Sequence, residues 1–428
     1  MKLQELKRII VAQSEEIKQK LEKEKIIKRE VDFKEFRKYL SHPNILAILG
    51  IRRCGKSVLS WQILKKENLF PYINFDDERL AEFDTHDFDK LLQSFYELYG
   101  EFEYVVFDGI QNVAGFEFFL NRMRRTKKVI ITGSNSRMLA GELSTRLTGR
   151  YIDFTLFPFS FREFLKFNNF TFQKEDFYST KKIGLLKRML EEYLKTGGLP
   201  EGYLFGREIL VRIYQDILDK DILRRYKVKK KATFKQFCKY LISNTASEFS
   251  LNRLKNVFGV KDIHTLRNWL TFLEEAYLII VLERFSFKLK EQMIAPKKVY
   301  CMDSGLINVI GFSFSEGIGK MIENVVAIEL LRRKSYWKRN SEIYYWKDHR
   351  HNEVDFVVKE GNKIKQLIQV SYDIQNFNTK EREIKNLIKA SKELKCDDLL
   401  VINWDYEGIE TLKEKEIKFM PLWKWLLQ

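Results

Sequence analysis

The stretch that most constrains how this chain can fold is ILAILGIRRCGKS, from Ile45 to Ser57. An apolar run suited to a buried strand ends at Gly50, and the pattern G-x-x-x-x-G-K-S that follows is the phosphate-binding P-loop signature. Its backbone N–H groups cradle phosphates, its lysine reaches the terminal phosphates, and its serine hydroxyl can hold Mg²⁺. A helical pattern comes next, as the motif demands, which disfavours a chance match in a strand-to-helix turn. The predicted nucleotide-binding residues of this loop are Gly50, Ile51, Arg52, Arg53, Cys54, Gly55, Lys56, Ser57 and Val58.

A second apolar run, YVVFD, ends at Asp108, whose carboxylate can order Mg²⁺ through water in the Walker B role. Ser57 and Asp108 are therefore the predicted metal residues, and ATP with Mg²⁺ is the predicted ligand. Hydrolysis also needs a general base or a water-positioning group, and the next residue, Gly109, supplies neither. Either hydrolysis is slow or another carboxylate substitutes, so enzyme activity stays open. Asp76 and Asp77 close a different strand, which we expect at the sheet edge. This position argues against their carboxylates reaching the attacking water.

Three polar residues further along complete the predicted catalytic set. Asn135 follows the apolar strand KVIIT, where it can touch the γ-phosphate or the attacking water, although turn geometry alone also selects asparagine. Arg146 and Arg150, in TRLTGR, are placed like arginine fingers that reach a neighbouring subunit's nucleotide, or they are solvated arginines at a helix end. The predicted catalytic residues are thus Asp108, Asn135, Arg146 and Arg150, and the fingers would imply a homo-oligomer.

The order of the elements and the composition bound the class of protein. Strands alternating with helices predict an α/β domain whose parallel sheet has helices on both faces. A formal charge of +17 and a pI near 9.4 favour an anionic partner, nucleic acid before membrane surface, although solvated lysine-rich faces also produce such a surplus. Four dispersed cysteines without a C-x-x-C pair indicate a reducing compartment. No apolar stretch approaches the ~20 residues that span a bilayer, and the first residues lack a signal-peptide pattern, so we expect a cytoplasmic protein with no membrane partner.

The amino-acid sequences of several segments resemble those of one known family. GIRRCGKS, YINFDDERL, VVFDGIQNVAGFEFFLNRM, ITGSNS, TGRYIDFTLFPFSFREFL and TGGLPE together resemble the prokaryotic and archaeal ATPases of the AAA+ superfamily that carry a C-terminal domain of unknown function, DUF4143. The resemblance covers nearly the whole chain and implies an ATP-binding protein. The residue after the Walker B aspartate is usually a catalytic glutamate in this class of ATPases, and Gly109 departs from that pattern. Pro200, in GGLP, is similar to a proline that lies near the nucleotide in related signalling ATPases; a helix-breaking turn is the alternative.

A basic stretch and a helix-turn-helix pattern follow. The cations in RRYKVKKK that we assign to DNA contact are Arg224, Arg225, Lys229, Lys230 and Lys231. Next come a short helix, Gly259 as a left-handed stop, a longer helix capped by Asp262, and a strand pair, which is the outline of a winged helix-turn-helix. The polar face of the longer helix carries His264, Arg267, Asn268 and Thr271. These side chains could meet phosphates and base edges of DNA, although winged helices also dock proteins or act as lids.

The last part of the chain carries two acidic residues and a glutamine on neighbouring elements of mixed helix and strand character. Glu323 lies in a helix, Asp355 closes EVD at the start of a strand, and Gln369 lies in the following strand. This layout resembles restriction-endonuclease-like folds, in which an aspartate and a later Glu-x-Lys gather Mg²⁺ and activate water. Gln369 and Ser371 stand where that Glu-x-Lys pair would be, which should weaken metal affinity and base activation. We therefore expect a vestigial nuclease site, with a scaffold favoured over a working enzyme.

These inferences predict an α/β protein with a P-loop NTPase parallel sheet, a helical lid, a winged helix-turn-helix and a C-terminal α/β nuclease-like domain. The predicted boundaries are an N-terminal helical arm (1–40), an AAA+ ATPase core (41–160), a helical lid (161–232), a winged helix-turn-helix (233–290) and a nuclease-like domain (291–428). The predicted function is a slow ATP-dependent switch coupled to DNA binding. The alternatives are an ATP-locked protein-interaction module and, less favoured, a metal-dependent DNA nuclease.

Overall fold

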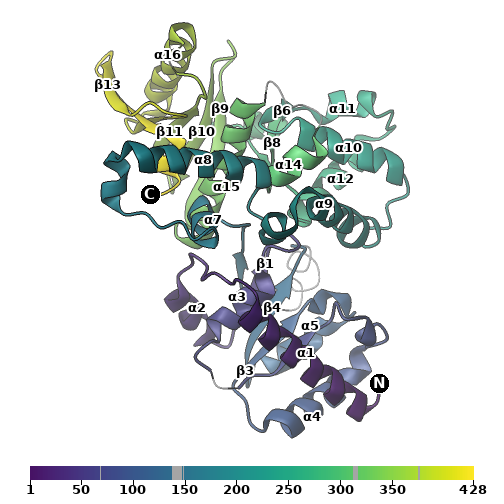
Figure 1. The fold of residues 1–428 in the computed structure, drawn as a ribbon. Helices are drawn as coiled ribbons and strands as arrows, with labels where there is room; N and C mark the ends of the chain where they lie inside the picture. Colours follow the sequence, from purple (N-terminus) through teal and green to yellow (C-terminus); the bar gives the residue numbers. More distant parts are fainter. Residues whose placement is uncertain (68, 137–146, 148, 312–316, 375) are drawn as a thin grey trace. The chain divides into compact units, whose positions relative to one another are not determined.

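The structure, a computed structural model, describes residues 1–67, 69–136, 147, 149–311, 317–374 and 376–428. It divides into two compact units, Met1–Phe157 and Pro158–Gln428 (Figure 1). Among the described residues, none of the helices combines the length and apolar character needed to cross a bilayer.

The first unit is built on a parallel sheet with the strand order β2-β3-β4-β1-β5. In chain order its strands are β1 (Ile45–Leu49), β2 (Tyr72–Asn74), β3 (Tyr104–Asp108), β4 (Lys128–Gly133) and β5 (Tyr151–Thr155). Strand β1 is buried along its whole length, as expected for a continuous apolar run covered on both faces. Because all neighbours are parallel, the carboxyl ends of the strands meet at one edge, where ligands bind in open α/β sheets. Strand β2 lies at the border of the sheet, as the sequence predicts.

The helices of the first unit begin with a long N-terminal helix, purple in Figure 1, that packs on β2 and α4. They are α1 (Leu3–Lys23), α2 (Phe33–Leu40), α3 (Lys56–Ile63), α4 (Phe88–Tyr99) and α5 (Phe116–Met123), with the 3₁₀ turns η1 (Glu78–Leu80), η2 (Thr85–Asp87) and η3 (Ile110–Asn112). The buried side chain of Gln13 on α1 donates to the carbonyl of Asn74 at 3.0 Å and accepts from its N–H at 2.8 Å. A single amide thus satisfies the outer backbone groups of an edge strand, which would otherwise be unpaired.

The second unit begins with helices and continues with a small antiparallel sheet of order β6-β8-β7. The helical part comprises α7 (Phe161–Phe167), η5 (Lys174–Tyr178), α8 (Thr180–Thr196), α9 (Pro200–Asp216) and the π-helix η6 (Ile217–Leu223). Then come α10 (Lys231–Ser243), β6 (Ser247–Phe249), α11 (Leu251–Val257), α12 (Ile263–Glu275), β7 (Ile279–Leu282), α13 (Leu289–Ile294), β8 (Lys297–Cys301) and α14 (Ser304–Ile310). The pairing of β8 with β6 and β7 carries this sheet across the predicted division at residues 290 and 291.

A mixed sheet of order β13-β14-β12-β11-β10-β9 forms the last part of the second unit. Its elements are α15 (Ile318–Tyr336), β9 (Ser341–Lys347), β10 (Glu353–Glu360), β11 (Lys363–Val370), α16 (Phe377–Leu394), β12 (Leu399–Asn403), β13 (Gly408–Leu412), β14 (Lys415–Pro421) and α17 (Leu422–Trp425). The antiparallel strands β13 and β14 (yellow in Figure 1), which the sequence analysis did not predict, follow β12 and extend the sheet. The parallel sheet of the first unit, the helices after it and this mixed sheet confirm the predicted α/β class.

Candidate functional site

The P-loop runs from the end of β1 to the start of α3, as the sequence predicts. Gly50 has φ +147°, and a Cβ there would lie 2.2 Å from the carbonyl oxygen of Leu156, so this close packing of loop on backbone requires glycine. Lys56 at the first position of α3 donates to the carbonyl oxygens of Gly50 at 3.1 Å and Ile51 at 2.9 Å. The lysine therefore lies folded over the loop, in the place from which it would reach phosphate oxygens.

An arginine that the sequence analysis did not identify holds the loop from the N-terminal arm. The buried guanidinium of Arg29 donates to the carbonyl oxygens of Cys54 at 2.8 Å and Phe157 at 2.7 Å. Cys54 is itself buried, and its thiol lies 3.4 Å from the carbonyl of Leu156. These contacts hold the loop at Cys54 against the segment that follows β5.

The carboxylate of Asp108 lies at the carboxyl end of β3, in the register predicted for a Walker B residue. Tyr72 donates to its Oδ2 at 2.8 Å, and Thr132, its neighbour on β4, donates to Oδ1. Burial first, and then the charge of Asp108, raise the pKa of Tyr72 well above its ordinary value. A hydroxyl and a carboxylate are the hard oxygen donors that Mg²⁺ prefers, so Ser57 and Asp108 fit this ion.

The structure locates two of the three remaining catalytic candidates. Asn135 is buried just past β4, the strand that lies between β1 and β3, where a side chain can face both the P-loop and Asp108. Arg150 precedes β5 and its carbonyl accepts from the N–H of Ile45, so it lies at the amino edge of the sheet. The length of a strand, about 16 Å, separates it from the P-loop of its own chain. Its guanidinium donates to Asn121 at 3.2 Å. Arg146 lies outside the described residues.

The Gly-Leu-Pro element belongs to the second unit, where Pro200 is the first residue of α9. A buried carboxylate, Asp303, organises this turn: it accepts from the N–H of Gly198 at 2.6 Å and caps α14 through the N–H of Leu306 at 3.3 Å. Burial raises the pKa of Asp303 to about 6, against the opposing effect of these N–H groups. The role of Pro200 toward nucleotide stays a prediction.

The basic stretch and the helix-turn-helix pattern are joined by an aromatic stack. Tyr226, inside RRYKVKKK, stacks on Phe272 of α12 with ring centroids 3.9 Å apart, and its hydroxyl donates to Glu275. The polar face of α12 is exposed at His264, Arg267, Asn268 and Thr271, as predicted. The basic side chains are exposed at Arg224, Lys229, Lys230 and Lys231 and half-buried at Arg225. Among the described residues, none of these five cations has an ion-pair partner.

The predicted vestigial nuclease residues converge on a lysine that the sequence analysis missed. The buried ammonium of Lys298 on β8 lies 2.8 Å from Glu323, 3.1 Å from Asp355 and 2.6 Å from Glu353. Gln369 accepts from the N–H of Asp355 at 3.4 Å and donates to another buried carboxylate, Glu383, at 2.7 Å. The ion pair of Lys298 with Asp355 thus joins β8 to β10, although these strands belong to different sheets.

The charged side chains of this cluster shift one another's pKa. Burial lowers the pKa of Lys298, but the attraction of Glu323 and the neighbouring carboxylates outweighs it, and the pKa stands well above its ordinary value. Burial and the charge of Asp355 raise the pKa of Glu323 to about 7, against the effect of Lys298. The ammonium therefore occupies the centre toward which these carboxylates point. In the part of the chain that the structure describes, no group of three or more histidine, cysteine or acidic residues is arranged to hold a metal ion.

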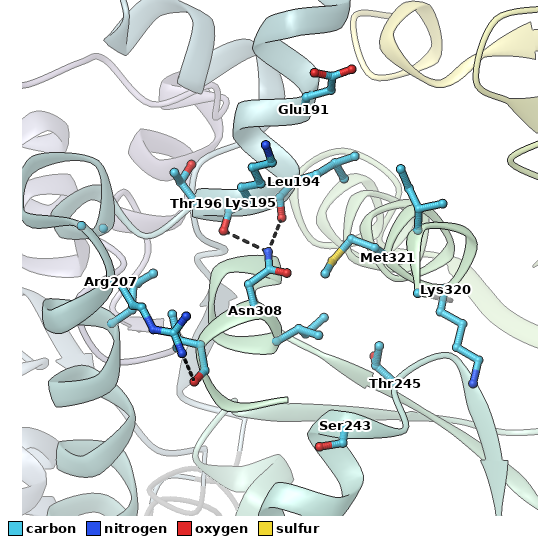
Figure 2. Close-up of a pocket in the computed structure, with 17 residues that line it drawn as sticks. Glu191, Leu194, Lys195, Thr196, Arg207, Ser243, Thr245, Asn308, Lys320 and Met321 are labelled. Carbon is cyan, nitrogen blue, oxygen red and sulfur yellow. Dashed lines mark hydrogen bonds between the residues drawn. The ribbon is translucent and has the colours of Figure 1, made fainter. Parts of the chain in front are cut away.

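A pocket of about 630 Å³ in the second unit is a further concave feature (Figure 2). It lies among α8, α9, α14 and the start of α15. The side chain of Asn308 on α14 holds α14 to α8 by donating to the carbonyls of Leu194 at 2.9 Å and Lys195 at 3.0 Å. Its lining is largely apolar, and its charged residues are Glu191, Lys195, Arg207 and Lys320. The sequence analysis did not predict this pocket, because its lining residues come from several separate helices.

Comparison with known proteins identifies the family. An AAA domain model matches residues 42–165, and models of two domains of unknown function, DUF8612 and DUF4143, match residues 187–316 and 318–425. An uncharacterized protein of Methanocaldococcus jannaschii, MJ1544, is 35% identical over 425 residues, which cover 95% of this chain and 92% of that protein. This chain belongs to the AAA-domain P-loop ATPases with a C-terminal DUF4143 domain. An uncharacterized relative of this ATPase in Haemophilus influenzae is 29% identical over 406 residues, or 90% of this chain and 94% of the relative.

A solved structure similar to this ATPase is the Walker-type ATPase PABY2304 of Pyrococcus abyssi. The match has 16% sequence identity and a TM-score of 0.43, and it covers 67% of this chain and 96% of that one. The family implies a nucleotide and Mg²⁺ at the P-loop, and the loop, Ser57 and Asp108 have the chemistry to hold them.

Proposed function

We propose that this ATPase binds Mg²⁺-ATP at its P-loop, hydrolyses it slowly and uses the nucleotide state to control DNA binding by its second unit. The support for nucleotide binding is the family and the geometry of Lys56, Ser57 and Asp108. Gly109 supports slow turnover, because the usual glutamate is missing after Asp108. The position of Arg150 at the amino edge of the sheet supports a role toward a neighbouring subunit rather than toward its own nucleotide.

The proposed domains keep the order predicted from the sequence: helical arm, ATPase core, helical lid, winged helix-turn-helix and degenerate nuclease-like domain. The order α10-β6-α11-α12-β7-α13-β8, with β8 between the other two strands of the sheet, supports the winged helix. We draw its end after β8, because β8 pairs with both β6 and β7. The four cysteines, all free and buried, support a reducing compartment such as the cytoplasm.

The observation that carries the DNA-binding proposal is the stack of Tyr226 on Phe272. It ties the basic stretch to the helix whose polar face carries Arg267 and Asn268, so phosphate-binding and base-reading side chains belong to one surface. The cations of the stretch have no ion-pair partner among the residues described, which leaves them available to phosphates.

The test is the salt dependence of binding to duplex DNA, with and without a non-hydrolysable Mg²⁺-ATP analogue. Replacing Lys229, Lys230 and Lys231 by Gln should reduce the slope of log K against log salt by about 2–3. Replacing the exposed lysines Lys18, Lys23 and Lys66 of the first unit by Gln is the matched control and should leave the slope unchanged. The analogue should shift the affinity about fivefold or more in the wild type but not in Lys56→Ala. Absence of DNA binding would instead favour the protein-interaction module, and an unchanged affinity would remove the switch.

The carboxylate cluster supports a scaffold rather than a nuclease. The ammonium of Lys298 lies among Glu323, Glu353 and Asp355, where a catalytic cation would have to bind. A metal ion would need to displace a buried, threefold-paired lysine. Plasmid incubated with Mg²⁺ or Mn²⁺ should therefore remain intact; cleavage that is lost in Asp355→Ala would establish the nuclease instead.

A further inference from the structure

We propose that Asp76 is the catalytic base of this ATPase and takes the role of the glutamate that is missing at position 109. The inference rests on the proposed ATP hydrolysis and names the residue that activates water for it. Gly109 has φ +66°, and a Cβ built on it would lie 3.4 Å from both Cγ and Oδ1 of Asp76. The carboxylate of Asp76 therefore lies directly beside the position from which a glutamate side chain would extend.

The reach of the two side chains is nearly the same. The carboxyl carbon of a glutamate lies about 2.5 Å from its own Cβ, two C–C bonds of about 1.5 Å away. The carboxyl carbon of Asp76 lies 3.4 Å from the same Cβ position, so the two carboxyl groups lie at comparable distances from it. The sequence analysis argued against Asp76 because it follows an edge strand, but the chain turns back toward β3 after Asn74 and brings Asp76 beside Gly109. The pairing of Asn74 with Asp108 brings these strand ends together.

The carboxylate of Asp76 is held on one side and open on the other. Its Oδ1 accepts from Asn112 at 2.6 Å, and its own N–H donates to the side chain of Asn74 at 3.0 Å. In the described part of the chain its Oδ2 has no hydrogen-bond donor, and the residue is exposed to water. Asp77 is half-buried, and Arg79 and Gln13 donate to its two oxygens.

Asp76 also lies next to the strand end that carries Asp108. The N–H of Phe75, the residue before it, donates to the carbonyl of Asp108 at 2.9 Å, and Asp76 itself lies beside Gly109. A carboxylate in this position can accept a proton from a water molecule ordered next to the metal.

The proposed step balances without any further reactant. A water proton passes to Oδ2 of Asp76 while the water oxygen forms a bond to the γ-phosphorus. The bond between this phosphorus and the β–γ bridging oxygen breaks, and the bridging oxygen keeps the electron pair on ADP. Lys56 and Mg²⁺ would stabilise the negative charge on these oxygens, and Asp76 then returns its proton to solvent.

The test compares Asp76→Asn with Asp77→Asn in the full-length protein, with Lys56→Ala as the background. Asparagine keeps an oxygen to accept from Asn112 but cannot act as a base, so a purely structural role of Asp76 would survive. We expect kcat for phosphate release to fall about a hundredfold in Asp76→Asn, with KM and Mg²⁺-ATP binding unchanged. Asp77→Asn should stay within about twofold of the wild type.

An Asp76→Asn variant that releases phosphate at the wild-type rate would overturn the assignment. So would a loss confined to KM, because it would make Asp76 a binding residue. A wild type no faster than Lys56→Ala would refute ATP hydrolysis itself and the assignment with it. A wrong assignment of the base appears only in Asp76→Asn, whereas a failure of ATP hydrolysis appears in the wild-type protein. The two failures are therefore distinguishable.

Discussion

The guanidinium of Arg29 donates a 2.8 Å hydrogen bond to the carbonyl oxygen of Cys54, in the middle of the P-loop. Gln62 on α3 secures the segment that carries Arg29, because it donates to the carbonyl of Ile27 at 2.7 Å and accepts from the N–H of Arg29 at 3.2 Å. The chain that follows α1 is thereby fastened to both the loop and the helix that make the phosphate site. The N-terminal arm is a structural part of the nucleotide site.

Replacing Arg29 by Met should lower the affinity for Mg²⁺-ATP about tenfold. Hydrogen bonds from a charged donor contribute about 1.5–3 kcal/mol, and without them the carbonyl of Cys54 loses its partner and the loop its fixed conformation. Calorimetric titration measures the change. Arg8→Met, an exposed arginine on α1, is the matched control. Equal affinities of the two variants would show that the hydrogen bonds of Arg29 do not contribute to nucleotide binding.

Replacing Gln13 by Leu should destabilise the first unit by about 1–3 kcal/mol, because the backbone groups of Asn74 lose their partner beside an apolar side chain. Gln93→Leu, an exposed site on α4, should change the stability by less than about 0.5 kcal/mol. Denaturant unfolding of both variants measures the difference. A Gln13 variant as stable as the control would mean that water satisfies these backbone groups.

Replacing Lys298 by Met should cost about 3–5 kcal/mol at pH 8, because it leaves buried carboxylates without their cation. Lys297→Met is a close control: the neighbouring lysine pairs with Glu283 at the surface, where an ion pair contributes about 0–1 kcal/mol. The loss in Lys298→Met should be smaller at pH 5. Glu323 has a pKa of about 7 even beside the lysine, so it is neutral at pH 5 and no longer needs the cation. Equal losses at both pH values would contradict this account of the cluster.

Glu274 makes a separate pH prediction. Burial raises its pKa to about 7, above the ordinary value that it has in the unfolded chain. The protonated form favours the folded state, so this contribution is fully present below about pH 4 and is lost as the pH rises to 7. Glu274→Gln should therefore raise the stability by about 1–2 kcal/mol at pH 8 and have little effect at pH 4. The exposed Glu192→Gln is the control, and a pH-independent effect of Glu274→Gln would contradict the raised pKa.

Much of the first unit could be predicted from the sequence because its signals are local. Strands β1 and β3 are uninterrupted apolar runs that end at Gly50 and Asp108, so the pattern locates both the strands and the site at their ends. The polar face of α12 follows in the same way from helical spacing. Strands β13 and β14 escaped prediction because charged residues alternate through them and β13 is mostly exposed.

The residues that the sequence did not identify are those whose partners are distant in the chain. Arg29 looks like a solvated arginine in a polar linker until the fold brings it to Cys54. Lys298 lies in a strand of another sheet, so no spacing relates it to Asp355, and an argument based on Glu-x-Lys alone finds the lysine missing. Asp76 seemed too far away because strand order gives the position of a backbone but not the direction in which the next turn takes a side chain.

Calorimetric titration of Mg²⁺-ATP into the full-length protein and into Lys56→Ala tests the central claim most directly. The account predicts saturable heat and a higher melting temperature for the wild type, since a ligand that binds only the folded state stabilises it, and a strong loss of both in Lys56→Ala. A wild-type protein that shows neither heat nor a change in melting temperature would contradict it.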